Sequence, residues 1–349
     1  MIWLAWRQFR VAAFAMALLA VAVLGTLVLT GPHIAHLYSV SGLNHCVSPD
    51  ACSQARDAFF GAIKSDGSTP VVYFALIAVL YLLPALLGLF WGAPLLARES
   101  EAGTFRLVWT QSVTRRRWLA VKLSVGTAAA IVLTTALSWG ITWWSSPIDR
   151  AAQLPGGQDD ALPNHFNPVV FGARGVVPVA IAVFGFLVGV TAGLLLRRTL
   201  PAVAATLAIL ATVQATVPMA VRQNYATPDR TTVPLVVQSR PGLQLQIVDS
   251  RLTVRMPVDL PGAWVTSVNL VDATGTPFHG LAPQACEGML ESPDSCFAAI
   301  NALHLRQAAE YQPGDRFGRF QGEEAALYAL LSIVLAGLCF YRIRRMVPA

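Results

Sequence analysis

Charge is scarce in this chain of 349 residues. Asp, Glu, Lys and Arg make up 13% of it, whereas charged residues make up about 25% of an ordinary soluble domain. Hydrophobic residues make up 55%. A water-soluble domain needs more polar surface than this composition supplies, so the sequence excludes an ordinary soluble globular protein.

Familiar catalytic signatures are also missing. The sequence has no P-loop, no HExxH or other metal spacing among its six histidines, no CxxC element and no nucleophile elbow. We therefore expect no catalytic residue, no metal ligand and no cofactor-binding residue, and we expect that the chain is not an enzyme.

Long apolar runs are what the chain has in abundance. A run of about 18 or more apolar residues with few charges predicts a transmembrane helix. The six runs are approximately Val11–Leu29, Val71–Leu96, Leu119–Trp144, Val176–Leu196, Leu200–Val221 and Ala325–Tyr341. They predict an all-α polytopic membrane protein with six transmembrane helices. The first run lacks a clear cleavage site, so we expect a retained span rather than a signal peptide.

The cations are distributed unevenly between these runs. With a cytosolic N-terminus, the inner segments are residues 1–10, 98–122, 197–198 and 342–349, and the shorter outer loops are 30–70 and 145–175. The inner segments hold 13 Lys and Arg and the two outer loops hold 4. This bias follows the positive-inside rule. We therefore predict a multi-pass cell-membrane protein with cytosolic N- and C-termini, and attribute the net charge of +6 to orientation, with no nucleic-acid partner.

Four of the five cysteines fall in the predicted outer loops. Cys46 and Cys52 form one close pair, Cys286 and Cys296 form another, and Cys339 lies in the last run. Disulfides persist in oxidising compartments, so we predict two local disulfides. Four free thiols or a metal site are the alternatives.

Two further features concern the spans. Residues 1–10, MIWLAWRQFR, suit a cytosolic amphipathic interfacial helix, and a plain extension of the first span is the alternative. Gly185, Gly189 and Gly193 form a doubled GxxxG stripe. Such a stripe lets helices approach closely, either within one chain, which we favour, or at a dimer interface.

Residues 223–323 are long enough for a small domain. Alternating apolar residues predict a hairpin over 243–258 and a strand with a turn over 263–277, and residues 296–311 look helical. We expect a β-rich extracellular insertion between transmembrane helices 5 and 6. The expected domain boundaries are 1–10, 11–222 for helices 1–5 with the segment 98–122 inside it, 223–323, 324–341 for helix 6, and 342–349 for a cytosolic tail.

Ionisable residues are essentially missing from the interior of the six runs. Lys122 lies near the inner end of the third run, where it could extend to the interface, and Arg174, Glu323 and Glu324 lie at outer ends. Ion-coupled transporters need such groups at membrane depth, so that class is disfavoured. An apolar interior suits a lipophilic or amphipathic cargo.

Charged residues are concentrated in residues 98–122, which we call the coupling segment. It holds six cations and two acids between two uncharged runs. A basic loop that contacts anionic lipid explains the arginines. It does not explain the acids or the aromatic residues Phe105 and Trp109.

The coupling segment resembles that of the permease subunits of ABC type-2 transporters. The resemblance rests on Arg-Glu-x-Glu-x-Gly-Thr after the second span, a Thr-Arg-Arg-Arg run, and a Lys that enters the third span. The order of elements along the whole chain agrees with it. Residues 311–324, YQPGDRFGRFQGEE, resemble an actinobacterial branch of this bacterial family.

The resemblance implies an ATP-driven exporter subunit that dimerises with a second permease copy or a paralogue. A separate cytosolic ABC ATPase subunit would bind the coupling segment and carry ATP and Mg, with no cofactor on this chain. The implied coupling residues are Arg98, Glu99, Glu101, Gly103, Thr104, Phe105, Trp109, Arg115, Arg116 and Arg117. The alternative function is a membrane sensor or assembly protein that uses its extracellular domain for binding.

Overall fold

The computed structural model describes residues 2–345, apart from 102–113, 156–161, 238–243, 249–250, 256–257, 259, 279, 282 and 287–292. For residues 2–10, 244–248, 251–253 and 255 it describes the backbone alone.

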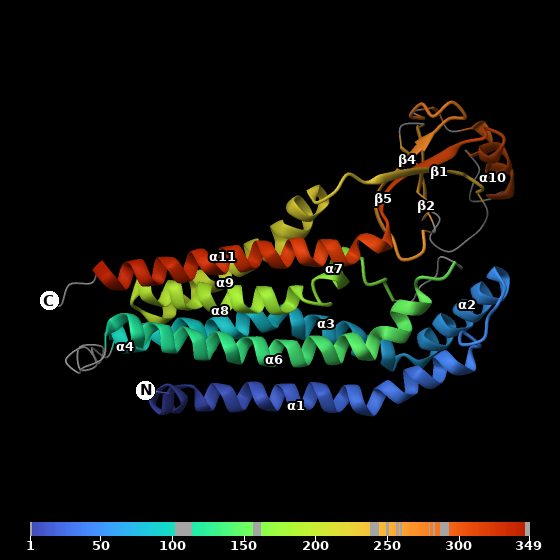
Figure 1. Ribbon diagram of the computed structural model, residues 1–349. Coiled ribbons are helices and arrows are strands. Elements are labelled where there is room, and N and C mark those ends of the chain that lie inside the picture. The colour runs from blue at the N-terminus through green and yellow to red at the C-terminus, as the bar shows by residue number, and fades with distance from the viewer. Residues whose placement is uncertain are drawn as a thin grey trace.

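Six helical stretches of the described chain are long and apolar enough to cross a membrane, as predicted. They are α1 (Ile2–Val40), α3 (Ser68–Leu87) with η1 (Gly88–Gly92) and α4 (Ala93–Glu101), α6 (Arg115–Ala151), α8 (Val177–Leu196), α9 (Thr199–Thr216) with η2 (Val217–Val221) and η3 (Arg222–Asn224), and α11 (Phe317–Arg345). They form an elongated bundle in which α4, the start of α1 and the end of α11 share one end (Figure 1).

The helices extend beyond the apolar runs that predicted them. α1 continues to Val40, and α6 runs from Arg115 to Ala151. Polar residues can follow a helix out of the apolar layer, since capping and turn residues decide where it ends. Helix α1 continues through residue 10 without a break. This continuity is what we expect if residues 1–10 are a plain extension of the first span.

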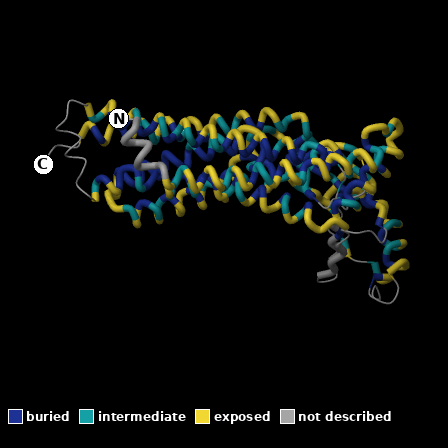
Figure 2. Tube along the Cα trace, turned by 90° about the horizontal axis from the view of Figure 1, so that it is seen from below, coloured by how far each residue is buried: buried dark blue, intermediate teal, exposed yellow. Residues whose placement is uncertain are grey.

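Helix α8 is the centre of the bundle. Its sequence is apolar on every side, and such a helix belongs in a core. It is the most deeply buried of the six candidate spans and contacts α3, η1, α4, α6, α9 and α11. Figure 2 shows the buried residues gathered between the helices and the exposed residues on the outside.

The glycine stripe of α8 packs against the second span within the same chain. A Cβ atom on Gly185 would lie 2.5 Å from the Pro84 carbonyl oxygen, and Cβ atoms on Gly189 and Gly193 would collide with the carbonyl oxygens of Gly88 and Ala93. These backbones touch because α8 carries no side chain along the stripe. The stripe is therefore used within one chain.

A small β-rich domain lies at the end of the bundle opposite α4 (Figure 1). The strands are β1 (Asp229–Pro234), β2 (Gln244–Val248), β3 (Arg251–Arg255), β4 (Trp264–Val271) and β5 (Arg306–Gln312). The first sheet has the order β1-β5-β4 and is antiparallel, with a bulge between Val265 and Ser267. β2 and β3 form the predicted antiparallel hairpin.

The helix expected over 296–311 is wrong in its second half. Helix α10 spans Pro293–Asn301, and β5 begins at Arg306. β5 pairs with β1 on one side and with β4 on the other. Two rows of strand hydrogen bonds thus override the helical preference of its alanines, as tertiary context routinely does.

The remaining described helices are shorter than the six candidate spans. α2 (Pro49–Asp66) lies in the loop after α1 and is capped by the Ser48 hydroxyl, which accepts a hydrogen bond from the Ala51 amide. The remaining ones are α7 (Pro168–Phe171), η4 (Gln284–Cys286) and η5 (Gly314–Arg316).

Candidate functional site

The coupling segment leaves the bundle at the end of α4 and re-enters it at the start of α6. Thr114 caps α6, where its hydroxyl accepts a hydrogen bond from the Arg117 amide. The predicted coupling residues Gly103, Thr104, Phe105 and Trp109 lie outside the described residues. The other six predicted coupling residues flank this gap on α4 and α6.

Glu99 and Lys122 form an ion pair between the two legs of the segment. The Lys122 ammonium group donates a hydrogen bond to Glu99 Oε1 over 2.5 Å and also lies 3.5 Å from the Leu95 carbonyl oxygen. The ammonium nitrogen lies 4.5 Å from the centre of the Trp118 ring. Lys122 is 3% exposed and Glu99 is 9% exposed. The pair fixes α4 against α6 just before the chain leaves the bundle.

This arrangement corrects the expectation for Lys122 and describes the surroundings of Glu99. Lys122 does not extend to the interface, because its charge is balanced inside the bundle by Glu99. Glu99 is turned into the bundle, and its predicted part in an ATPase contact stays a prediction. A buried charge is stable only when it is paired and hydrogen-bonded, which explains why these two side chains meet.

Glu101 connects the second span to the fifth. Its carboxylate accepts hydrogen bonds from the Thr199 amide at 2.7 Å and from the Thr199 hydroxyl at 2.8 Å. Thr199 is the first residue of α9, so Glu101 occupies the position of an N-terminal cap for that helix. Negative charge is favourable there, because the first amide groups of a helix have no partners inside it.

The three arginines that open α6 oppose the helix dipole. Arg115, Arg116 and Arg117 lie in its first turn, and the last two are exposed. Cations are favourable at a helix C-terminus and unfavourable at its N-terminus. Helix stability therefore does not account for these residues.

A second polar cluster connects the end of the fifth span, α7 and the start of α8 to α11, beside the β-rich domain. Arg222 at the end of the fifth span donates two hydrogen bonds to Glu324 of α11, at 2.8 and 3.0 Å, and a third to the Pro168 carbonyl oxygen. Both side chains are almost fully buried. The Gln321 side-chain oxygen accepts hydrogen bonds from the amides of Val176 and Val177.

Residues 311–324 connect the β-rich domain to α11. Besides Gln321 and Glu324 they include Arg316, which donates hydrogen bonds to Asp229 of β1 and to the Thr227 carbonyl oxygen. Phe317 and Phe320 pack edge-on against Phe166. The motif thus joins β5 to α11 through hydrogen bonds and ring contacts.

Both predicted cysteine pairs lie at disulfide distance. The sulfur atoms of Cys46 and Cys52 are 2.11 Å apart, and those of Cys286 and Cys296 are 2.02 Å apart. Cys339 is a buried free cysteine next to the Thr191 hydroxyl. Among the described residues, no group of three or more His, Cys, Asp or Glu could hold a metal ion.

The sequence did not identify the buried ion pairs. Glu99 and Lys122 are 23 residues apart, and Arg222 and Glu324 are 102 residues apart. One signal was available: all four residues lie at the ends of apolar runs, where a charge must either reach water or find a partner.

The comparisons with known proteins agree with the bundle and its coupling segment. Residues 15–222 match the model of a family described as ABC-2 membrane transporter related. No curated protein and no solved structure matched the chain. The matched region covers more than half of the chain and includes five of the six candidate spans and the coupling segment. The chain is therefore a member of the ABC-2 membrane transporter related family.

Proposed function

We propose that this protein is the permease subunit of an ATP-driven ABC exporter of a lipophilic or amphipathic substrate. The coupling segment binds a separate cytosolic ATPase subunit, which carries ATP and Mg. The chain itself contributes no catalytic residue. Membership of this family supports a role as the membrane permease component of a transporter. Export, dimerisation and assignment to the actinobacterial branch are further parts of the proposal.

One observation carries the coupling role. Glu99 and Glu101 lie two residues apart on α4 and bond to different helices, Glu99 to α6 and Glu101 to α9. A movement of the coupling segment is then transmitted to three spans at once, since charged hydrogen bonds fix the geometry of both contacts. A basic topology loop would not need these two connections.

The proposed orientation places the coupling segment and both ends of the chain in the cytosol and the β-rich domain outside the cell. The cation distribution supports it. Single cysteines at Arg116 and Ala273, both exposed, test it by labelling of intact cells with a membrane-impermeant maleimide. We expect labelling of Ala273→Cys alone, and labelling of Arg116→Cys from outside would refute the orientation.

A membrane sensor or assembly protein is the alternative from another functional class. The β-rich domain, which residues 311–324 hold to the bundle, would serve it equally well. To separate the two, the tagged chain is solubilised from its native membrane in a mild detergent and its partners are identified. We expect a P-loop ATPase in stoichiometric amount and ATP hydrolysis by the complex. Purification without any ATPase, from cells that express the neighbouring genes, would favour the alternative.

A further inference from the structure

A pocket of about 570 Å³ lies between α1 and the second span near the coupling segment. Its size falls within the range of about 300–1,000 Å³ that is usual for small-molecule sites. The residues that line it are Val11, Ala12, Ala15, Met16, Leu86, Phe90, Trp91, Pro94, Leu95 and Arg98. Nine of these ten side chains are apolar.

The pocket has a buried floor and an exposed rim. Met16, Trp91 and Leu95 are at most 6% exposed and form the floor, whereas Val11 is 75% exposed and Phe90 is 59% exposed. Exposed apolar residues on a membrane-spanning helix face lipid. The open rim of the pocket is therefore apolar, as is the surface that a membrane-spanning helix presents to lipid.

The π-helical turn η1 shapes this wall. η1 carries Phe90 and Trp91, and Pro94 follows it. A π-helical turn inserts one residue into an α-helix and is frequent at functional sites. Here Phe90 lies at the exposed rim and its neighbour Trp91 lies on the buried floor.

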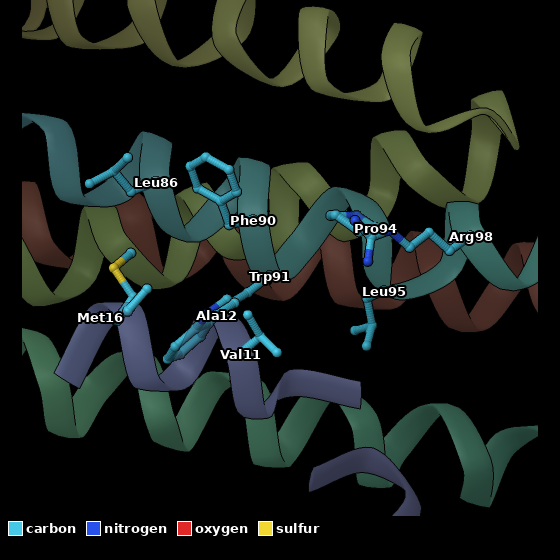
Figure 3. A pocket seen from close by; sticks show the side chains of 10 residues that line it. Val11, Ala12, Met16, Leu86, Phe90, Trp91, Pro94, Leu95 and Arg98 are labelled. Atoms are coloured by element: carbon cyan, nitrogen blue, oxygen red, sulfur yellow. The ribbon is translucent and has the colours of Figure 1, made fainter. Parts of the chain in front are cut away.

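Arg98 supplies the one charge of the lining. Figure 3 shows it at one end of the pocket, with Leu86 and Met16 at the other. Arg98 is exposed, and the nearest acid whose charge interacts with it is Glu101, whose carboxylate oxygens already accept hydrogen bonds from Thr199. It lies at the end of the bundle from which the coupling segment leaves, where a headgroup layer would be. A guanidinium group is well suited to bind phosphate.

We infer that this pocket binds an anionic phospholipid of the surrounding bilayer, with an acyl chain along the apolar floor and its phosphate at Arg98. The chemistry of the lining fits both parts of such a molecule. The inference does not depend on the proposed transport function, because a sensor could hold the same lipid.

The test is lipid binding to the purified chain in detergent, measured by native mass spectrometry. Phosphatidylglycerol is titrated against phosphatidylcholine with identical acyl chains. We expect a preference for phosphatidylglycerol that Arg98→Gln reduces about fivefold, as the loss of about 1 kcal/mol per Arg near an anionic surface implies. Arg230→Gln, which removes an exposed arginine of the β-rich domain that does not line the pocket, is the matched control and should keep the preference.

A second variant tests the acyl-chain part. Ala15→Trp fills the pocket and should reduce binding of both lipids, whereas Ala17→Trp places the same bulk on another exposed face of α1 and should not. Equal binding by wild type, Arg98→Gln and Ala15→Trp would overturn the inference. So would rapid oxidative cross-linking of Ala15→Cys between two chains in the membrane, because a second copy would then cover the pocket.

Discussion

Glu99 and Lys122 belong to the charged coupling segment, yet both side chains are buried inside the bundle. Moving an ion out of water costs several kcal/mol, which is recovered only with good geometry and extra hydrogen bonds. Lys122 has the Glu99 carboxylate, the Leu95 carbonyl oxygen and the Trp118 ring around it. The two residues are therefore better described as one unit that holds α4 to α6 than as two surface charges.

The first prediction follows from that pairing. Lys122→Met leaves the Glu99 carboxylate buried without its cation, so we expect a loss of about 3–5 kcal/mol in the free energy of unfolding. The double variant Glu99→Leu/Lys122→Met removes both charges and should recover most of this loss. Denaturant unfolding in detergent micelles measures it.

Lys64 is the matched control, because it is the other lysine of the chain and is exposed. Lys64→Met should change the unfolding free energy by less than about 0.5 kcal/mol. A double variant that is as unstable as Lys122→Met would contradict the account of the pair.

His165 gives a pH-dependent prediction. Burial lowers the pKa of His165, the Arg174 charge lowers it further, and the Asp149 charge opposes this shift. The folded state thus favours the neutral imidazole, while the unfolded chain protonates near the ordinary pKa of about 6.5. The stabilisation is complete above that value and is lost as pH falls below it.

We expect the melting temperature of the wild-type protein to fall between about pH 7 and pH 5 by more than that of His165→Phe, which cannot be protonated. Thermal unfolding followed by tryptophan fluorescence at several pH values checks this. Parallel pH curves for the two proteins would show that His165 does not contribute.

At the scale of elements, the contact between α8 and the second span rests on missing side chains. Gly189 lies against the Gly88 carbonyl oxygen, so a single methyl group has no room. Gly337 of α11 has nothing within 4 Å of the position that a Cβ atom would take. The two glycines therefore predict opposite effects of the same substitution.

Gly189→Ala should destabilise the bundle by about 1–3 kcal/mol through overpacking. Gly337→Ala should stabilise it by about 0.5–1 kcal/mol, because alanine is the better helix former. Unfolding of both variants under one set of conditions gives the comparison. Equal effects at the two sites would mean that the close approach of the helices does not hold.

Apolar periodicity predicted the elements better than it predicted their ends. The spans were predicted correctly because crossing the hydrocarbon core of a membrane requires a long run of apolar residues, and such a run is easily seen in a sequence. Their ends were not, since Thr114 and Glu101 act through hydrogen bonds to specific amides. The strand β5 was mistaken for helix because its central place in a sheet depends on β1 and β4, which lie far away in the chain.

The candidate site was predicted in part. The Arg-Glu-x-Glu motif directed attention to the end of α4, but it could not show that Glu99 turns inward while Arg98 stays exposed. That difference depends on which face of α4 meets α6, a property of the packed bundle. A single sequence does not contain that information, because helix rotation is fixed only when the neighbouring helices are in place.

At the scale of the whole molecule, the two polar clusters lie at opposite ends of one bundle. Glu99, Lys122 and Glu101 connect the spans beside the coupling segment, and Arg222 and Glu324 connect them beside the β-rich domain. The helices between the clusters are apolar and tightly packed around α8. Such a body is suited to transmit a displacement from one end to the other, as the proposed function requires.

The proposed ATPase contact is tested most directly by retention of the partner ATPase on variants of the coupling segment. Trp109→Ala and Arg116→Glu are made in the tagged chain, with Arg344→Glu as a control that reverses an exposed charge at the same end of the bundle. We expect all three variants to insert normally, and the first two to bind the ATPase at least about tenfold more weakly, as a loss of about 1.4 kcal/mol or more at an interface gives. Full retention and full stimulation of the ATPase by Trp109→Ala and Arg116→Glu would contradict the account and leave the segment as a positively charged topology anchor.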